Sequence, residues 1–371
     1  MPRLLFITQK VDKDDDVLGT YHRWIEEFAG AFSSIEVVCL SRGTVDLPGN
    51  VRVYSLGKET QSDTDLRGWK RGFTRIKYIY RFYKYIWSLR KKYRLVFVHM
   101  NPVYIILGGL FWRSWRKPIF LWYNHPFGSW KTKLAIYFSQ EVFCTSPYSF
   151  SAKYKKTSLM PAGIDTDFFR PMQEISKNKK QILCLGRISP IKKIEYLIEA
   201  AKILDNKGLD FKVLIVGSPS SSKIDKEYEL KLKSMSVDLL SKGKIEFRPA
   251  VPNYSAPVIY NSAGVFVNLT PTGSLDKTIL EAMACSTVVL VSNKIFMELF
   301  PGFLRELCLF EEGNIEDCAI KMQELFKLNE ADKKHLSQEL RNLVVTKHSL
   351  DTLICKLFQE FDYENKRTVI K

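Results

Sequence analysis

The sequence has no hydrophobic run long enough to cross a membrane as a helix. Its longest apolar stretch, Pro102 to Trp112, is about half of the roughly 20 residues that such a helix needs. The first residues, Met1 to Thr8, lack the charged, apolar and small-residue regions of a signal peptide. We therefore expect a soluble protein of the cytoplasm.

Side chains that hold structural metals are few and scattered. None of the seven cysteines belongs to a Cys-x-x-Cys pair, and most stand in apolar runs, as thiols do when they pack as small hydrophobic groups in a reducing compartment. The five histidines show no paired spacing, and no Asp-x-Asp stands directly at the end of an expected strand. We expect neither a metal ion nor a cofactor.

Acidic residues are scarce in the first half of the chain. Residues 1–171 carry 27 basic and 14 acidic side chains, so most of the total net charge of +16 lies there. Such asymmetry is typical of a protein with a polyanionic partner, whether a phospholipid surface, a nucleic acid or a phosphorylated substrate. The length of 371 residues and the hydrophobic content of 46% predict either two ordinary globular domains or one large one.

Strands alternate with helices in both halves. The expected strands span residues 4–7, 35–40, 51–56, 95–98, 119–122, 141–144, 181–185, 211–216, 244–247, 264–269 and 288–291. The expected helices include residues 20–32, 192–204, 226–240, 278–285 and 316–328. This order predicts an α/β fold with two doubly wound, Rossmann-like units, joined by a polar linker at residues 171–180.

A glycine followed by two basic residues marks the first candidate site. Gly186 and Arg187 come directly after a buried strand, and Lys192 follows at the start of a helix. A planar guanidinium and an ammonium near a helix N-terminus suit a diphosphate. The alternative is that both side chains are only solvated on a surface loop.

A second candidate site begins at the end of the strand at residues 264–269. The turn from Pro271 to Asp276 enters a helix, so backbone N–H groups between Ser274 and Thr278 are expected to point at an anion. Glu281, which we expect on the first turn of this helix, would accept hydrogen bonds from sugar hydroxyls. The alternative is that this carboxylate only stabilises the helix dipole.

These residues resemble a known family. The matching segments are Gly186-Arg187 with Lys192, residues 194–200, 213–217, 280–285 and 161–171. In their order along the chain they are similar to the retaining nucleotide-sugar glycosyltransferases of the GT-B fold, specifically the family 4 type (group 1). Over residues 1–160 the resemblance rests on Leu18-Gly19 and on Asn124-His125-Pro126.

The resemblance implies a GT-B fold whose two Rossmann-like domains face a central cleft. Residues 1–170 would bind the acceptor, residues 171–349 would bind a nucleoside-diphosphate sugar, and residues 350–371 would form a helix that crosses back to the first domain. The implied activity is metal-independent transfer of a sugar, with retention, to a glycan or lipid-linked acceptor. The alternatives are a non-catalytic sugar-nucleotide-binding protein and a nucleotide-sugar epimerase.

The resemblance also implies roles for individual residues. The catalytic group would comprise Arg187, Lys192 and His125, although a histidine in such a turn also fits a purely local role. The donor-binding group would comprise Gly19, Gly186, Gly217, Gly273, Ser274, Leu275, Asp276, Lys277, Thr278 and Glu281. At position 273 the family usually has a glutamate that contacts the donor sugar, and this chain has glycine.

A basic and aromatic segment distinguishes the first half. Residues 66–94 contain 11 Lys or Arg, nine aromatic residues and no acid. The apolar positions 76, 79, 80, 83, 86 and 87 are expected to pack on the sheet of the first domain. This would leave Tyr78, Phe82 and Tyr85, with the membrane-binding residues Arg75, Lys77, Arg81 and Lys84, to face an anionic membrane. A solvated basic face is the alternative, and nucleic-acid binding is not expected because no nucleic-acid motif accompanies the segment.

The last helix carries one apolar stripe. Leu353, Ile354, Leu357, Phe358 and Phe361 repeat at helical spacing and need a buried partner. The second domain already has its alternation of strands and helices before this point. We expect residues 350–363 to pack against the first domain.

Overall fold

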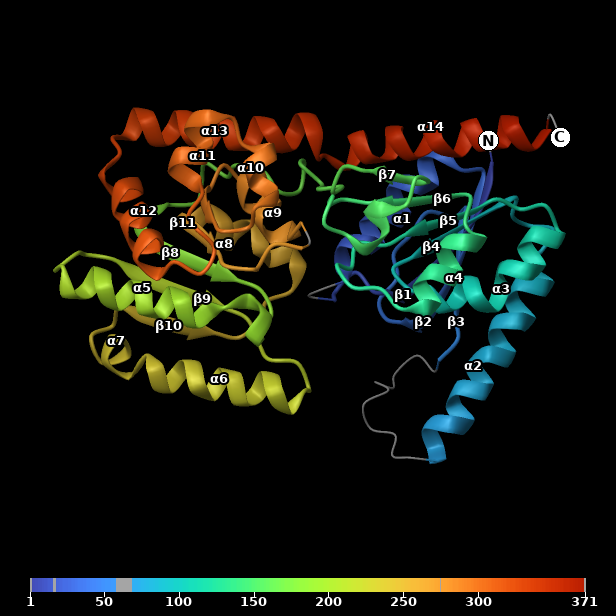
Figure 1. Cartoon of the computed structure of the whole chain (residues 1–371), viewed down its shortest axis with the longest axis horizontal. Helices are drawn as coiled ribbons and strands as arrows, with labels where there is room; N and C mark the ends of the chain where they lie inside the picture. The colour runs from blue at the N-terminus through green and yellow to red at the C-terminus, as the bar shows by residue number, and fades with distance from the viewer. Residues whose placement is uncertain (1, 16–17, 58–68, 274, 370–371) are drawn as a thin grey trace. The chain divides into compact units, whose positions relative to one another are not determined.

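The chain forms two compact α/β units (Figure 1). The computed structural model describes residues 2–15, 18–57, 69–273 and 275–369, with the backbone alone for residues 69–74 and 362–369. The first unit contains Met1–Pro161 and Asp351–Lys371, and the second contains Ala162–Leu350.

A parallel sheet of seven strands forms the centre of the first unit. The strands are β1 (Arg3–Val11), β2 (Ser34–Arg42), β3 (Val51–Ser55), β4 (Leu95–His99), β5 (Ile119–Trp122), β6 (Glu141–Cys144) and β7 (Thr157–Leu159). Their order is β3-β2-β1-β4-β5-β6-β7, and all pairs are parallel. All five residues of β4 are buried, as expected for a central strand with helices on both faces.

The helices of the first unit connect these strands. They are α1 (Gly19–Ala31), α2 (Trp69–Ser88), α3 (Val103–Ser114), α4 (Trp130–Phe138) and α14 (Leu350–Val369), with a 3-10 turn at Phe150–Lys153. On one side of the sheet Phe82 of α2 packs against Tyr104 and Trp112 of α3. The indole of this tryptophan donates a hydrogen bond to the Tyr93 hydroxyl at 3.0 Å.

The last helix of the chain packs against the first unit. Leu353 and Leu357 are fully buried and Phe361 nearly so, while Ile354 and Phe358 are half-buried. The Phe361 ring lies 4.6 Å from the Phe120 ring, measured between centroids. The apolar stripe of α14 is therefore part of the first unit's core.

The second unit has a parallel sheet of five strands. They are β8 (Asn178–Leu185), β9 (Lys212–Val216), β10 (Ile245–Arg248), β11 (Ala263–Asn268) and β12 (Val288–Val291), in the order β10-β9-β8-β11-β12. The helices are α5 (Ile194–Asn206), α6 (Lys223–Met235), α7 (Val237–Ser241), α8 (Ala256–Ser262), α9 (Lys277–Ala284), α10 (Ile295–Leu299), α11 (Gly302–Cys308), α12 (Ile315–Lys327) and α13 (Glu330–Lys347), with 3-10 turns at Pro190–Lys192 and Asn253–Ser255.

The strand order of the second unit reverses between β8 and β11. The chain runs outward from β8 through β9 to β10 and then returns to place β11 on the other side of β8. Open parallel sheets bind ligands at such a switch point, beyond the carboxyl ends of the strands. A ligand-binding site is therefore expected at the loops that follow β8 and β11.

The second unit begins earlier than the expected boundary at residue 170. Ala162, Ile164 and Phe169 belong to its buried core, and the Ile164 N–H donates to the His348 carbonyl at 2.9 Å. Residues 162–177 are thus tied into the second unit. The polar character of residues 171–180 reflects an exposed surface segment and the exposed start of β8.

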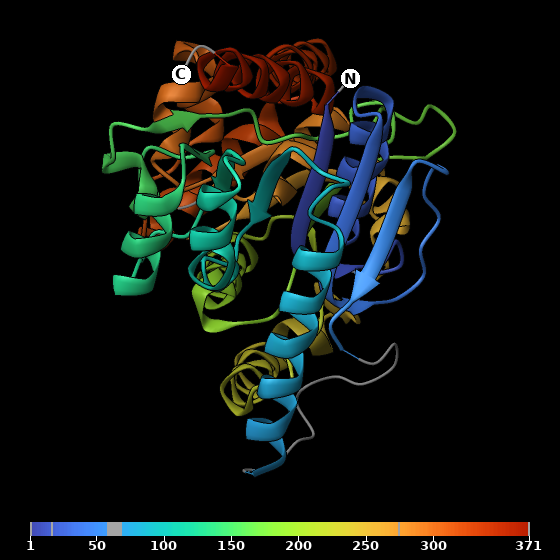
Figure 2. The same cartoon turned by 90° about the vertical axis from the view of Figure 1, so that its right-hand side faces the viewer.

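Helix α2 packs through a different face from the one we expected. Phe82 and Ile86 are buried, but Ile76, Ile79, Tyr80 and Trp87 are exposed. Of the expected positions, Ile86 is buried and Tyr83 is half-buried. The stripe was wrong at the other four, because the buried face follows the helical spacing of Phe82, Ile86 and Leu89. In both views the amino-terminal part of α2 extends beyond the sheet of its own unit (Figures 1 and 2).

Candidate functional site

The loop after β8 is fixed by contact with the end of β9. Gly186 donates its N–H to the Val216 carbonyl at 3.0 Å, with φ at +143°. A Cβ atom on Gly217 would lie only 2.0 Å from the Gly186 carbonyl oxygen, so position 217 requires glycine. The side chain of Arg187, which follows at once, is exposed to solvent.

The loop after β11 is organised by the Asp276 carboxylate. Asp276 caps α9 by accepting hydrogen bonds from the Thr278 N–H at 3.2 Å and the Thr278 hydroxyl at 3.0 Å. It also accepts from the Asn268 amide at 3.0 Å and the Thr270 hydroxyl at 3.1 Å. A single carboxylate thus joins the end of β11 to the start of α9.

Lys192 links the two loops. Its ammonium lies 2.5 Å from the Asp276 carboxylate and 3.4 Å from the Thr270 hydroxyl. Burial alone would raise the pKa of the Asp276 carboxyl, but Lys192 and the hydrogen bonds from Asn268 and Thr278 lower it well below 3.8. The positive charge of Lys192 is therefore held at the N-terminus of α9, at the switch point of the sheet.

Glu281 lies one turn into α9, and its carboxylate is buried. It accepts a hydrogen bond at 3.0 Å from the hydroxyl of Tyr260 on α8. Burial raises the pKa of the Glu281 carboxyl and lowers the pKa of the Lys277 ammonium, and the attraction between the two partly offsets both shifts. The helix begins at Lys277, one residue before the expected start at Thr278, so Glu281 lies just past the first turn and not on it.

Other predicted donor-binding residues surround the N-terminus of α9. Gly273 is buried with φ at +156°, Leu275 is buried, and Thr278 is half-buried. Ser274 lies outside the described residues. The structure thus brings Lys192, Asp276, Thr278 and their neighbours together at the carboxyl end of the sheet.

The sequence did not point to Tyr260, Asn268 and Thr270, which complete the hydrogen-bond network. Asn268 is the last residue of β11, and Thr270 follows it two positions later. The available signal was their place at the carboxyl end of an expected strand, where polar residues tend to serve a site.

Two predicted residues belong to the first unit. Gly19 is the buried first residue of α1, and its N–H donates to the Asp15 carbonyl at 3.2 Å. His125 follows β5 in a turn, with its side chain exposed. Its Nδ1 accepts from the Phe127 N–H at 3.3 Å, and its carbonyl accepts from the Phe150 N–H at 2.9 Å. His125 thus takes part in the hydrogen bonds of its turn and keeps an exposed ring.

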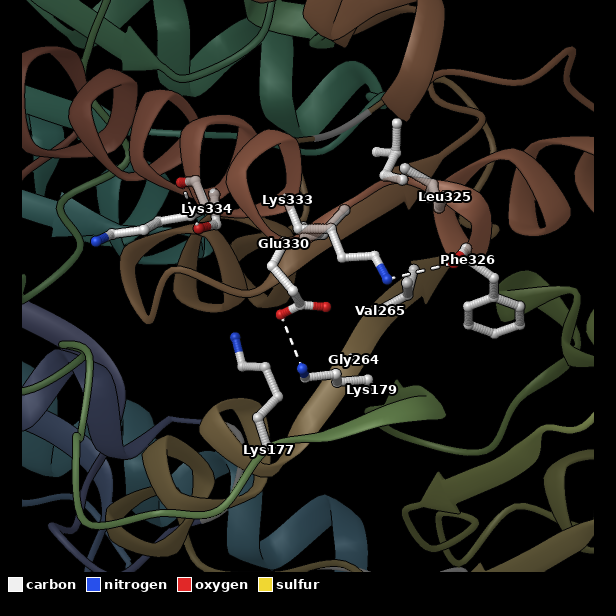
Figure 3. Close-up of a pocket in the computed structure, with 12 residues that line it drawn as sticks. Lys177, Lys179, Gly264, Val265, Leu325, Phe326, Glu330, Lys333 and Lys334 are labelled. Atoms are coloured by element: carbon white, nitrogen blue, oxygen red, sulfur yellow. Dashed lines mark hydrogen bonds and ion pairs between the residues drawn. The ribbon is translucent and has the colours of Figure 1, made fainter.

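A pocket of about 230 Å³ lies at the opposite edge of the second sheet (Figure 3). Its lining includes Gly264 and Val288 at the amino ends of β11 and β12. Lys179 forms an ion pair with Glu330 at 2.9 Å there, and Lys333 donates to the Phe326 carbonyl at 3.3 Å. This pocket is separate from the loops that carry the candidate site.

Further observations concern cysteine, metal ligands and membrane spans. All seven cysteines are free thiols. Within the described ranges, no group of three or more His, Cys, Asp or Glu side chains is placed to hold a metal ion. In the same part of the chain, no helix is both long and apolar enough to span a membrane.

The two Rossmann-like units define a protein of the GT-B fold. Solved structures share this fold along nearly the whole chain. A sucrose-phosphate synthase from Thermosynechococcus elongatus has a TM-score of 0.78 at 16% identity, covering 98% of this chain and 100% of that one. Anabaena Alr3699/HepE in complex with UDP and glucose has a TM-score of 0.74 at 14% identity, with coverages of 98% and 100%.

The match to a protein family lies in the second unit. Residues 165–342 match the family model described as glycosyl transferases group 1, so this unit belongs to that family. Over 145 residues, the chain is 26% identical to a D-inositol 3-phosphate glycosyltransferase from Mycobacteroides abscessus, covering 37% of this chain and 31% of the relative. Over 190 residues it is 26% identical to a mannosylfructose-phosphate synthase from Agrobacterium fabrum, covering 48% and 41%. The chain thus matches less than half of the length of these relatives.

Proposed function

We propose that this protein is a retaining glycosyltransferase that uses a nucleoside-diphosphate sugar. The acceptor is a glycan or a lipid-linked molecule at the cytoplasmic face of a membrane. The observation that carries the proposal is the pair of loops joined by Lys192 and Asp276 at the switch point of the second sheet. It combines a fixed cation with the N-terminus of a helix, which is the arrangement that a diphosphate needs.

Lys192 has room for a donor phosphate. An ammonium group has three N–H donors, and Asp276 and Thr270 accept from two of them. The third N–H binds a diphosphate oxygen, and the exposed Arg187 folds onto the same group with its guanidinium fork. Asp276 acts as a positioning residue, because it fixes the ammonium without touching the donor.

In the proposed reaction the bond between the sugar C1 and the diphosphate oxygen breaks, and the electron pair leaves with the diphosphate. Arg187, Lys192 and the α9 N-terminus stabilise the negative charge that develops there. The acceptor hydroxyl forms its bond to C1 on the same face and passes its proton to the departing diphosphate. Because side chains and backbone supply the positive charge, we propose that the transfer needs neither a metal nor a cofactor.

The proposed membrane contact rests on exposed apolar side chains of the first unit. Ile76, Ile79, Tyr80 and Trp87 of α2 are exposed, as are Leu110 and Phe111 of α3. The Trp87 ring contacts the Phe111 ring at 6.0 Å between centroids, so exposed apolar side chains of the two helices meet there. We call this set the α2–α3 strip. Basic residues beside it would meet lipid phosphates while its rings enter the interface.

The test is a panel of UDP-, GDP- and ADP-sugars with the purified full-length chain, with donor hydrolysis and transfer as readouts. We expect turnover with one donor, full activity in excess chelator, and a product that keeps the donor's anomeric configuration by NMR. Arg187→Ala should lower turnover by about a hundredfold or more, the scale of losing one donor to a developing anion. Arg170→Ala, an exposed arginine of the same unit, is the matched control.

Three outcomes would contradict the proposal. Donor binding without hydrolysis or transfer would favour a non-catalytic sugar-nucleotide-binding protein. Conversion of the donor to its epimer without an acceptor would favour an epimerase. Full turnover in a folded Arg187→Ala protein would remove the assigned leaving-group role.

A further inference from the structure

A second pocket lies in the first unit, beside α2. It has a volume of about 710 Å³, and its walls come from the ends of β2 and β3 and from one face of α2. Arg42 and Ser55, the last residues of β2 and β3, both line it. The pocket therefore lies at the carboxyl edge of a parallel sheet, where α/β folds bind ligands.

Among the residues that the structure describes, the charged ones that line this pocket are all basic. They are Arg42, Lys77, Arg81 and Lys84. Within the part of the chain that the structure describes, no carboxylate lies within ion-pair distance of these four side chains. Four cations around one space repel each other, and an anion bound between them would relieve that repulsion.

Arg81 gives the pocket a rigid wall. Its Nη1 donates hydrogen bonds to the carbonyls of Leu56 at 2.7 Å and Gly57 at 3.3 Å, just after β3. These bonds hold the guanidinium in place and leave its other N–H groups for a ligand. Arg81 is half-buried, so it fits a pocket better than the flat membrane-facing surface that the sequence predicted.

Aromatic rings complete the pocket. The Tyr85 ring lies against the Tyr54 ring, tilted by 46° and 5.3 Å away between centroids, and its hydroxyl donates to the Ser55 carbonyl at 3.4 Å. Tyr80 also lines the pocket and is exposed. A volume of this size is typical of pockets for small molecules and exceeds what one phosphate fills. The rings would take the uncharged part of a ligand.

We propose that this pocket binds the phosphate group of a phosphorylated acceptor, either a sugar phosphate or the phosphate of a lipid headgroup. Phosphate binding follows from the pocket alone, and the word acceptor rests on the proposed glycosyl transfer. The guanidinium and ammonium groups bind the phosphate oxygens through charge-assisted hydrogen bonds. The four basic residues thus serve one ligand, and Arg75, which is exposed on α2 outside the pocket, does not take part.

The test measures binding of glucose 6-phosphate, glucose and UDP to the full-length chain by calorimetry. We expect glucose 6-phosphate to bind and glucose not to bind. A protein with Arg42→Gln and Lys84→Gln should bind glucose 6-phosphate about tenfold more weakly or worse, because each substitution removes a charge-assisted hydrogen bond. Arg75→Gln should leave this affinity unchanged.

A crossed control separates this pocket from the proposed donor site. Arg187→Gln should weaken UDP binding and spare glucose 6-phosphate, and the Arg42→Gln and Lys84→Gln protein should show the reverse. If UDP, GDP and ADP all fail to bind the wild type, the proposed donor site is wrong and the pocket stands. If Arg75→Gln weakens glucose 6-phosphate binding as much as the pocket substitutions do, the pocket proposal is overturned, because the basic face then acts diffusely.

Vesicles identify the source of the phosphate. The wild type and the Arg42→Gln and Lys84→Gln protein are sedimented with phosphatidylcholine vesicles, with and without phosphatidylglycerol. Binding to the anionic vesicles that glucose 6-phosphate competes away would assign the pocket to a lipid headgroup. Glucose 6-phosphate binding that these vesicles leave unaffected would assign it to a soluble sugar phosphate. If neither ligand depends on Arg42 and Lys84, the proposal is overturned.

Discussion

At the scale of single residues, the contact between Lys192 and Asp276 decides how the second unit's two loops are held. The pair is largely buried, with side-chain exposures of 21% and 12%. Asp276 also caps α9, so it holds a charge and a helix end at once. Losing this carboxylate would leave Lys192 without a counter-ion beside the positive end of a helix.

We therefore predict that Asp276→Asn lowers the free energy of unfolding by about 1–3 kcal/mol. The same substitution should reduce turnover, because Lys192 is no longer fixed. Urea denaturation and donor turnover measure the two effects. Asp210→Asn, which breaks the exposed Lys180–Asp210 pair, is the control and should change neither. Equal stability in the two variants would contradict the structural role.

A second residue-scale prediction concerns acid. His348 is 7% exposed, its Nδ1 accepts from the Ala162 N–H at 3.3 Å, and burial lowers its pKa from 6.5 to about 4. The folded protein thus keeps this histidine neutral where the unfolded chain protonates it. The contribution of neutral His348 to the free energy of unfolding is fully present above about pH 6.5 and is lost as the pH falls towards 4.

The difference between these pKa values corresponds to about 3 kcal/mol, which is an upper estimate for the loss of stability of the second unit on acidification. His348→Gln removes the titration, so its stability should fall less over the same pH range. Urea denaturation of both proteins from pH 7 to pH 4 measures the slopes. Parallel curves for wild type and variant would show that other groups control the acid response.

The site was only partly predictable from residue patterns. Gly186, Lys192 and Asp276 follow expected strands in sequence, so their meeting at one sheet edge could be anticipated. The hydrogen bond from Tyr260 to Glu281 could not, because it joins two helices whose packing depends on the whole core. The salt bridge of Lys192 was missed for a similar reason: both partners were assigned to the ligand, and their attraction to each other was overlooked.

At the scale of elements, α2 and α3 present apolar side chains that the unit itself leaves uncovered. Ile76 is 65% exposed, on a helix that also carries Lys77 and Lys84. Burying such a side chain in the membrane interface gains about 1.5–3 kcal/mol when burial is complete. The α2–α3 strip therefore offers a second contribution to membrane binding, independent of charge.

We predict that the double substitution Ile76→Ser and Ile79→Ser weakens binding to anionic vesicles by about tenfold or more. The loss should persist at high salt, because the contribution is apolar. Ile224→Ser in α6 is the matched control, since that isoleucine is 66% exposed in the second unit. Co-sedimentation measures all three proteins. Equal binding of the double variant and the control would exclude the strip as a membrane contact.

Most elements could be predicted, and the exceptions have physical reasons. The buried strands read as continuous apolar runs because helices cover both faces of each sheet. Strand β7 has three residues, none of them buried, so it lacks that signal. Helix α13 was overlooked because its sequence is mostly polar, although the spacing of Leu336, Leu340, Leu343 and Val344 marks its buried face.

At the scale of the whole molecule, the first unit is built from two parts of the chain that are far apart in sequence. Phe361 of α14 contacts the rings of Phe97, Phe120 and Phe143, which belong to β4, β5 and β6. The second unit is thus inserted between the two parts. Each unit has its own core, so we expect the units to respond separately to core substitutions.

Accordingly, Phe361→Ala should destabilise the first unit by about 3–5 kcal/mol, the usual cost of removing a buried phenylalanine ring. The second unit should be unaffected. Differential scanning calorimetry of the full chain should show one transition moving to lower temperature and the other unchanged. Gln359→Ala, at an exposed position of the same helix, is the control. A shift of both transitions would mean that the units unfold together.

The insertion also sets the order in which the protein is completed during translation. The strands that carry Phe97, Phe120 and Phe143 leave the ribosome first, and α14 follows only after the whole second unit. At a translation rate of roughly 5–20 residues per second, about 10–40 seconds pass between the synthesis of these strands and the synthesis of the helix that covers their rings. During that time the nascent chain exposes an aromatic surface that binds chaperones or aggregates, whereas the second unit can fold as soon as it emerges. A chain that ends before residue 350 lacks the helix that covers these rings in the first unit.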